Sequence, residues 1–343
     1  MSISDQLWDT FYQKAVALKK TAPWDWITEE QMFAVKDPYS ERIGFCLLMG
    51  RLGEHYALNI YLGEEGLLSY YNVAEYEGNY YYDVMFRQKS IMCSFEDRKM
   101  LENSEIKRIK KLGFSFRGKN GWPLVRKYDP GLVPWFLEDE TDILFLISTI
   151  EQTLLLAEEY KDHVDDLSPD DEMLFRTSLK TKNGLRWKSE KLKTDPLIRK
   201  WLGNHPLPQP MINQIRLEQL AKTLSGSEQI WIADASFLPS PIKDNNRKRP
   251  YFPLVFLIID EQSQQILHFA LLNKDTSHTG IPLEFMNFLE KRGQIPSKIV
   301  FVHAETEALL EPIADRLHIE ILSSMHEPLF EAILNDFVQF NQG

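Results

Sequence analysis

The stretch "QIWIADASFLPSPIKDNNRKRPYFPLVFLIID" occupies residues 229–260 and decides the fold that we expect for the C-terminal part of the chain. Two apolar runs, 229–235 and 251–259, are rich in β-branched and aromatic residues, and a loop with Pro, Asn and Arg-Lys-Arg separates them. This pattern predicts two strands. Asp234 lies in the middle of the first strand, where a carboxylate is unusual because buried acids need a partner or a ligand.

The residues that follow continue the alternation of strands and helices. We expect a third strand at 265–272, and then a helix, a strand, a helix, the short strand "IEIL" and a last helix, at 282–291, 298–303, 305–317, 319–322 and 327–340. Three strands followed by this alternation predict an α/β domain with helices packed on a mixed sheet.

Composition limits the class of protein. Hydrophobic residues make up 43% and charged residues 26% of the 343 residues, which is typical of a globular chain with more than one core. A formal net charge of −11 disfavours a general affinity for nucleic acid or anionic membranes. The N-terminus lacks an apolar signal-peptide core, and no apolar run is long enough to span a bilayer. The two cysteines, Cys46 and Cys93, lie in apolar runs and predict buried thiols in a reducing cytoplasm.

The first 163 residues predict an α+β domain. We expect helices at 5–20 and 139–163, paired strands at 43–49 and 56–62, a strand at 89–96, and a helix ending at Gly113. Residues 114–137 are rich in turn-forming and aromatic residues.

Residues 164–222 predict a basic connector between two acidic domains, 1–163 and 223–343. Asn183-Gly184 lies between two alternating runs and predicts a hairpin, and "PMINQIRLEQLAKTL" predicts a helix. The hairpin carries Lys180, Lys182, Arg186 and Lys188 around Trp187, which is a pattern that suits a nucleic-acid backbone and a stacked base. The alternative is a solvated hairpin with one packed face.

The C-terminal domain resembles the ribonuclease H-like fold of nucleases, transposases and integrases, because "WIADASFLP" places an acid on the first strand and the element order agrees. The resemblance implies three carboxylates that hold Mg²⁺ or Mn²⁺ for phosphodiester cleavage. By position these are Asp234, Glu305 and Glu327, with Glu331 as a substitute for the last. "IVFVHAE" departs from the family pattern, because His303 stands where such enzymes carry an acid, and imidazole is a poor ligand for Mg²⁺.

The whole chain also resembles a group of uncharacterised bacterial proteins, in which a Trp-rich N-terminal domain of unknown function precedes a second domain of unknown function. "PWDW", "FRGKNGWP", "DPGLVPWFL" and "LPSPI" carry this resemblance.

The sequence therefore predicts a cytoplasmic protein that binds or regulates without catalysis and without a cofactor, with an unknown protein or peptide partner and a degenerate ribonuclease H-like domain. Asp234 is then a carboxylate held by loop amides or by Arg249. The alternative is a Mg²⁺- or Mn²⁺-dependent nuclease or transposase-like enzyme with Asp234, Glu305 and Glu327 as ligands.

Overall fold

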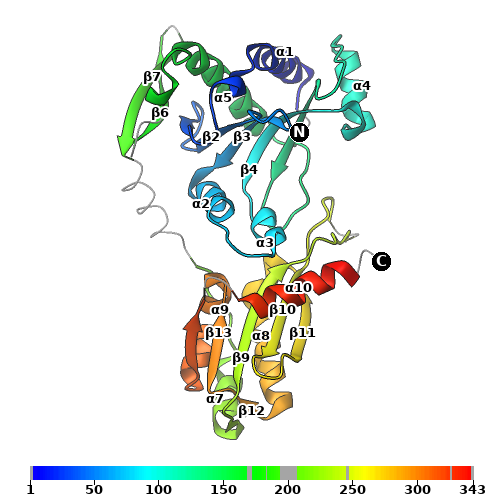
Figure 1. Cartoon of the computed structure of the whole chain (residues 1–343), viewed down its shortest axis with the longest axis vertical. Coiled ribbons are helices and arrows are strands. Elements are labelled where there is room, and N and C mark those ends of the chain that lie inside the picture. The colour runs from blue at the N-terminus through cyan, green and yellow to red at the C-terminus, as the bar shows by residue number, and fades with distance from the viewer. Residues whose placement is uncertain are drawn as a thin grey trace. The chain divides into compact units, whose positions relative to one another are not determined.

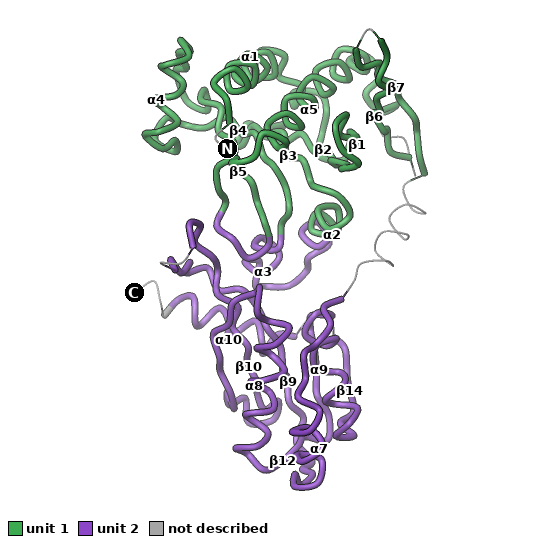
Figure 2. The backbone as a smooth tube through the Cα atoms, turned by 180° about the vertical axis from the view of Figure 1, so that it is seen from behind, with its two compact units in different colours: residues 1–71, 88–129, 134–205 green, residues 72–87, 130–133, 206–343 purple. Residues whose placement is uncertain are grey.

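The computed structural model describes residues 3–340 except 168–171, 183, 194–206, 245–246 and 325–326. The chain divides into two compact units and passes between them repeatedly (Figure 2). Unit 1 comprises residues 1–71, 88–129 and 134–205, and unit 2 comprises 72–87, 130–133 and 206–343. These bounds differ from the predicted division at residues 163 and 222, because residues 72–87 and 130–133 join unit 2 and the hairpin joins unit 1. Asn183 of the predicted hairpin falls outside the described residues.

Unit 1 is built on a seven-stranded sheet with the order β5-β4-β3-β2-β1-β6-β7 (Figure 1). Its strands are β1 (Phe33–Lys36), β2 (Ile43–Met49), β3 (Tyr56–Leu62), β4 (Ser90–Glu96), β5 (Trp122–Tyr128), β6 (Glu172–Thr181) and β7 (Gly184–Lys193). Its helices are α1 (Asp5–Thr21), α2 (Gly63–Ala74, which crosses into unit 2), α4 (Asn103–Lys111) and α5 (Glu140–Glu159), with short 3-10 turns at Pro23–Asp25, Arg98–Met100 and Val164–Asp166. The predicted α+β domain is thus present, and β2 and β3 match their expected bounds.

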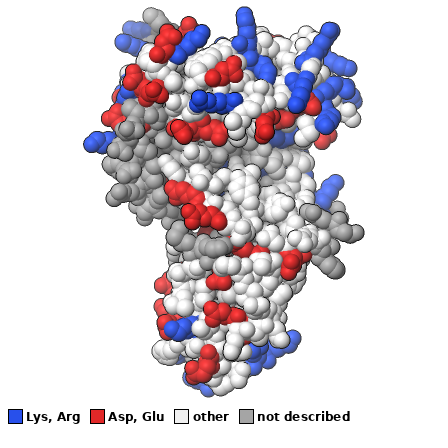
Figure 3. Space-filling view, viewed as in Figure 1, with Lys and Arg blue, Asp and Glu red and all other residues white. Residues whose placement is uncertain are grey.

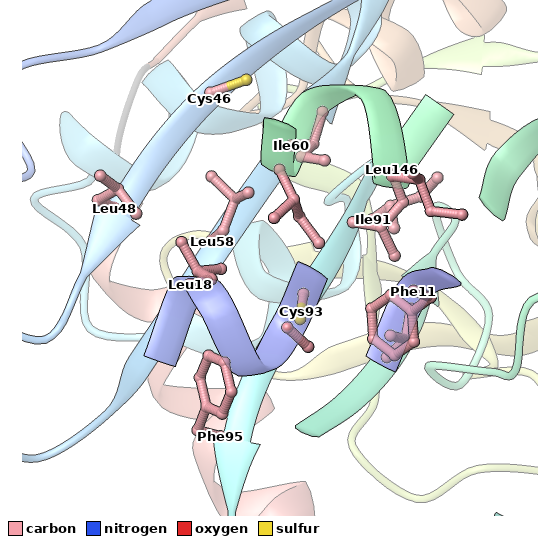
Figure 4. Packing of buried hydrophobic residues seen from close by; sticks show 14 of the residues in the cluster. Phe11, Leu18, Cys46, Leu48, Leu58, Ile60, Ile91, Cys93, Phe95 and Leu146 are labelled. Carbon is pink, nitrogen blue, oxygen red and sulfur yellow. The ribbon is translucent and has the colours of Figure 1, made fainter. Parts of the chain in front are cut away.

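The core of unit 1 follows the two-residue period of its strands. Cys46 and Leu48 of β2 face one side of the sheet, where they pack with α1 and α5, while Phe45 and Leu47 face the opposite side. Figure 4 shows side chains of α1, α5 and β2–β4 meeting in the first of these layers.

Two features of unit 1 differ from the prediction. The aromatic segment 114–137 contains strand β5 at the edge of the sheet, where Pro123 is tolerated because an edge strand has no neighbour on one side. The predicted connector hairpin is β6–β7, and β6 pairs in parallel with β1 over Leu174 to Arg176. The hairpin therefore extends the first sheet.

Unit 2 contains a five-stranded mixed sheet with the order β11-β10-β9-β13-β14. Its strands are β9 (Ile230–Phe237), β10 (Leu254–Asp260), β11 (Ile266–Leu272), β13 (Lys298–Phe301) and β14 (Glu320–Ser323), with a two-stranded sheet of β8 (Ser225–Gly226) and β12 (Gln294–Ile295). Its helices are α3 (Tyr81–Phe86), α7 (Gln214–Thr223), α8 (Ser277–Arg292), α9 (Ala304–Arg316) and α10 (Pro328–Phe340), with a 3-10 turn at Lys274–Thr276. Strands β11, β10 and β9 pair antiparallel, whereas β9, β13 and β14 pair in parallel.

Helices cover both faces of this sheet, which explains why β9 and β10 are apolar at nearly every position. One face of β9 (Trp231, Ala233) packs against α7, α8 and α9. The other face, which carries Ile232, packs with Tyr80 and α10. Asp234 follows the parity of Ile232 and therefore lies on the face of α10 and Tyr80.

Helix α8 begins five residues earlier than predicted, so that Pro282 lies inside it. A proline lacks the N–H that would bond to the carbonyl of His278 four residues before it. That carbonyl instead accepts a hydrogen bond from the backbone N–H of Met211 at 3.0 Å. The helix tolerates its proline because another segment satisfies the freed carbonyl.

Candidate functional site

The carboxylate of Asp234 is fully buried and is surrounded by donors. Its Oδ1 accepts from the backbone N–H of Ala235 at 2.6 Å, and its Oδ2 accepts from the backbone N–H of His303 at 2.7 Å and from that of Val302. The last two donors lie just beyond the end of β13, the parallel neighbour of β9. The charge of Asp234 is thus compensated by backbone N–H groups of its own strand and of the adjacent strand end.

The imidazole of His303 bridges two buried carboxylates. Its Nδ1 lies 3.1 Å from Oδ1 of Asp234, and its Nε2 lies 3.0 Å from Oδ2 of Asp83. A ring that contacts a carboxylate through each nitrogen donates through both only when it is protonated. Burial lowers the pKa of His303, but the charges of Asp234 and Asp83 outweigh burial and raise the pKa to about 10. His303 is therefore an imidazolium at neutral pH.

Asp83 comes from α3 and was not expected at this site. Its Oδ1 accepts from the Ser236 hydroxyl at 2.7 Å and from the Phe237 backbone N–H at 2.9 Å. Its Oδ2 accepts from Nε of Arg87 at 2.6 Å. Burial raises the pKa of Asp83, but the charges of Arg87 and His303 dominate and hold that pKa well below its usual range.

Arg87 completes a cluster of three acids and two cations, which we call the charge cluster: Asp83, Arg87, Asp234, His303 and Glu305. The Nη1 of Arg87 donates to Oε1 of Glu305 at 3.1 Å. The guanidinium lowers the pKa of Glu305, with a smaller opposing effect of burial. Burial opposes the charge of Arg87, but the Asp83 and Glu305 carboxylates nevertheless raise its pKa. The ionised cluster carries a single net negative charge, which makes its burial tolerable.

The segment that carries Asp83 is fastened to unit 2 by further contacts. The Tyr80 hydroxyl donates to the Phe237 carbonyl at 2.7 Å, and the Glu331 carboxylate accepts from the Asn79 backbone N–H at 2.6 Å. The ring of Phe86 stacks on Phe252 with centroids 3.7 Å apart. Residues 72–87 are thus an integral part of this unit.

The structure brings two of the three proposed metal ligands into one cluster. Asp234 and Glu305 both belong to it, joined through His303, Asp83 and Arg87. Glu327 precedes α10 and its carbonyl accepts from the backbone N–H of Glu331, whose own carboxylate holds Asn79. Within the described residues, no group of three or more His, Cys, Asp or Glu side chains is arranged to hold a metal ion. The oxygens of Asp83 and Asp234 already contact cations, backbone N–H groups or the Ser236 hydroxyl, an arrangement that does not suit ligands of a divalent metal.

Arg249, the expected alternative partner of Asp234, donates from its Nε to the Val133 carbonyl. The acid is held by His303 and by backbone N–H groups. Of the residues that the sequence did not indicate, Asp83 and Arg87 had one local signal, their four-residue spacing on a helix, which is common on ordinary helical surfaces.

The basic residues of the hairpin lie on two faces. The register pairs Lys180 with Leu185, Ser178 with Trp187, and Leu179 with Arg186. Directly paired residues share a face, so Lys180 and Trp187 lie on one side, while Arg186 and Lys188 lie on the other.

Two further observations concern the same hairpin. The half-buried Trp187 packs against the core of unit 1, and Lys188 forms an ion pair with Glu190. On the face shown in Figure 3, acidic and basic side chains of unit 1 are interspersed. The five residues remain a predicted nucleic-acid contact, but they do not present a single basic face.

The fold and the cluster define a mixed α/β protein of two units. Residues 8–176 match a family described as a domain of unknown function (DUF7309), and residues 216–338 match another described as a domain of unknown function (DUF6930). The expected pair of uncharacterised domains is thereby confirmed. No helix within the described residues is long and apolar enough to cross a membrane.

Comparison with other known proteins adds no function. A Bacteroides thetaiotaomicron protein, whose title gives an actin-like ATPase fold and unknown function, is similar to this chain at 11% identity. The similarity covers 90% of this chain and 96% of that chain with a TM-score of 0.19, which is too low to support an argument. No curated protein matches the chain.

Proposed function

We propose that unit 2 is a ribonuclease H-like domain whose acidic site has become an internal charge cluster, and that the protein acts by binding and not by metal-dependent phosphodiester cleavage. The strand order β11-β10-β9-β13-β14, with β10 antiparallel to both of its neighbours, supports the fold assignment. In that arrangement β9 is the first strand and the central one, and Asp234 is its acid.

One observation carries the functional proposal. His303 contacts both Asp234 and Asp83, and Arg87 contacts both Asp83 and Glu305, so two protein cations balance acids that a metal-dependent enzyme would balance with divalent metals. A metal would have to displace ion pairs that are at least partly buried, and breaking a buried pair costs roughly 3–5 kcal/mol. Metal-dependent activation of water has no support from such a site.

A binding role requires an accessible surface, and a groove in unit 1 offers one. A polar groove of about 460 Å³ lies between the turn after β1 and the β6–β7 hairpin. Lys36, Tyr39, Lys180 and Glu190 are among the residues that line it. We propose this groove as the binding surface for a protein or peptide partner. The buried free thiols of Cys46 and Cys93 support a cytoplasmic location, because such thiols persist in a reducing compartment.

Calorimetric titration of the full chain with Mn²⁺ tests the proposal. The wild type and Asp234→Asn are expected to give the same heats, since the amide keeps an acceptor for the backbone N–H groups and the site holds no metal. Glu290→Gln, which removes an exposed carboxylate elsewhere in unit 2, controls for weak surface binding. A nuclease assay on all three proteins accompanies the titration. Saturable Mn²⁺ binding or Mn²⁺-dependent cleavage that Asp234→Asn alone abolishes would refute the non-catalytic assignment.

A further inference from the structure

Strand β11 is an exposed apolar edge of the sheet in unit 2. Within the described residues it pairs with β10 on one side and with no strand on the other. Its sequence "ILHFALL" contains no Lys, Arg, Asp, Glu or Pro. Three of its side chains are exposed, namely Ile266, Phe269 and Leu271, with 43%, 44% and 50% of their surface accessible. An edge of this kind offers unpaired backbone groups and apolar side chains to another strand.

The other three edge strands of the two large sheets carry the features that discourage such pairing. Strand β5 contains Pro123 and two basic residues, and β7 carries several Lys and Arg side chains. Strand β14 is only four residues long, and its Glu320 forms an ion pair with Lys298. Charges, prolines and short length protect an edge strand, and β11 lacks all three.

One protective feature is present in β11, and it limits where pairing can occur. The register shifts between Ile258 and Ile259 of β10, so Leu267 is an extra residue and forms a bulge. A bulge disturbs the edge locally. The regular segment that remains is 268–272, with Ala270 at its centre.

This segment is complementary to itself. In an antiparallel pair centred on Ala270, Phe269 of each copy lies opposite Leu271 of the other. Both side chains lie on the same face of the strand, and Phe269 is already stacked on Phe337 of α10 with centroids 5.5 Å apart. The four exposed side chains would form one cross-strand cluster, and the small Ala270 would lie opposite its own copy.

We propose that the chain forms a two-fold symmetric dimer through antiparallel pairing of β11 with β11 of a second copy, centred on Ala270. The two five-stranded sheets then form one continuous sheet. A second copy suits this edge because segment 268–272 is complementary to itself and carries no charged side chain, so the contact adds no direct charge repulsion between two chains of net charge −11. A closed isologous contact also covers segment 268–272 in both copies.

Sedimentation equilibrium of the full chain tests the proposal. We expect twice the chain mass for the wild type, and a dimer that strengthens with added salt, because salt screens repulsion and the contact has no ion pairs to weaken. Phe269→Lys and Leu271→Lys each put a lysine opposite an apolar side chain of the other copy and make the two lysines diagonal neighbours, so each is expected to raise the dimer Kd at least about tenfold. Leu322→Lys, on the opposite edge strand β14, is the matched control and should leave the dimer unchanged.

A cysteine cross-link tests the register. Ala270→Cys should form a disulfide-linked dimer on mild oxidation, since the two Cβ atoms of a directly opposed pair lie about 4.5–5.5 Å apart. Leu322→Cys should not, and the native Cys46 and Cys93 are buried. A wild type that stays monomeric to about 100 µM, above the Kd of interfaces of ordinary size, would overturn the proposal. So would lysine variants that remain dimeric, or Ala270→Cys that cross-links no faster than Leu322→Cys.

Discussion

Replacing His303 with glutamine removes one positive charge from the charge cluster while keeping a polar side chain of similar length. His303 makes two charge-assisted hydrogen bonds, at 3.1 Å to Asp234 and 3.0 Å to Asp83. Each is worth about 1.5–3 kcal/mol, and a neutral glutamine amide recovers about 1 kcal/mol from one of them. Asp83 keeps Arg87, and Asp234 keeps its backbone donors. The expected loss of unfolding free energy is therefore about 2–5 kcal/mol.

The effect of His303 should depend on pH in one direction. The pKa of His303 rises from its ordinary value of 6.5 to about 10 in the folded chain. Below pH 6.5 the folded and unfolded forms both carry the proton, so the stabilising effect is fully present. As the pH rises, the unfolded form loses its proton first, and the stabilisation declines until it is lost above pH 10. The difference between wild type and His303→Gln should shrink over the same interval.

The measurement must report the stability of unit 2 alone, because a chain of two units does not unfold in a single step. Hydrogen exchange in urea, followed by mass spectrometry on peptides from β9, β13 and α3, gives a local free energy of opening. Lys298→Gln is the matched control, because it also removes a cation, but one on β13 whose ion-pair partner, Glu320, is exposed. This variant should lower the free energy of opening by less than about 1 kcal/mol, without the pH dependence of His303→Gln. A loss for His303→Gln that is equal below pH 6.5 and above pH 10 would refute the assignment of His303 as an imidazolium.

Two further predictions concern unit 1. Gly44→Ala should destabilise that unit by about 1–3 kcal/mol, because the added methyl group would contact Ile60 and lie 2.8 Å from the Phe145 ring. The same exchange experiment measures the change, and a variant as stable as the wild type would contradict this packing. Cys46 and Cys93 should react with a thiol reagent only after unfolding, because burial raises both thiol pKa values, that of Cys93 to about 12. Rapid reaction of the native protein would show that these strands open readily.

The elements of unit 2 that lie between residues 229 and 340 could be predicted from the sequence. Apolar runs between turn residues gave β9, β10 and β11 to within a few residues, and the helix and strand alternation that follows was also predicted. Such local patterns depend on periodicity and on turn chemistry. The start of α8 could not be predicted, because the donor that makes Pro282 acceptable inside the helix, the Met211 N–H, is distant in the sequence.

The site could be predicted only in part. Asp234, His303 and Glu305 stood out because charged side chains beside apolar strands are rare. Asp83 and Arg87 did not, since their significance depends on contacts of Asp83 with Ser236 and His303 and of Arg87 with Glu305, all more than 150 residues away in the chain. No local pattern indicates such a partner. A metal site and an internal charge cluster both require an acid on β9. The two kinds of site differ in the positions of the side chains around that acid, which the sequence does not give.

The path of the chain between the units has a consequence for how the two domains can be exchanged between genes. Residues 72–87 supply Asp83 and Arg87 to unit 2, although they lie within the stretch that matches the N-terminal family. A gene fragment that encodes only residues 206–343 would leave His303 without Asp83 and Glu305 without Arg87, and would expose the surface of β9 that Tyr80 covers. The second domain is therefore not an independent module that recombination can move to a new neighbour. A transferred copy of the second domain would also need residues 72–87 of the first domain. The two domains are therefore expected to be inherited together.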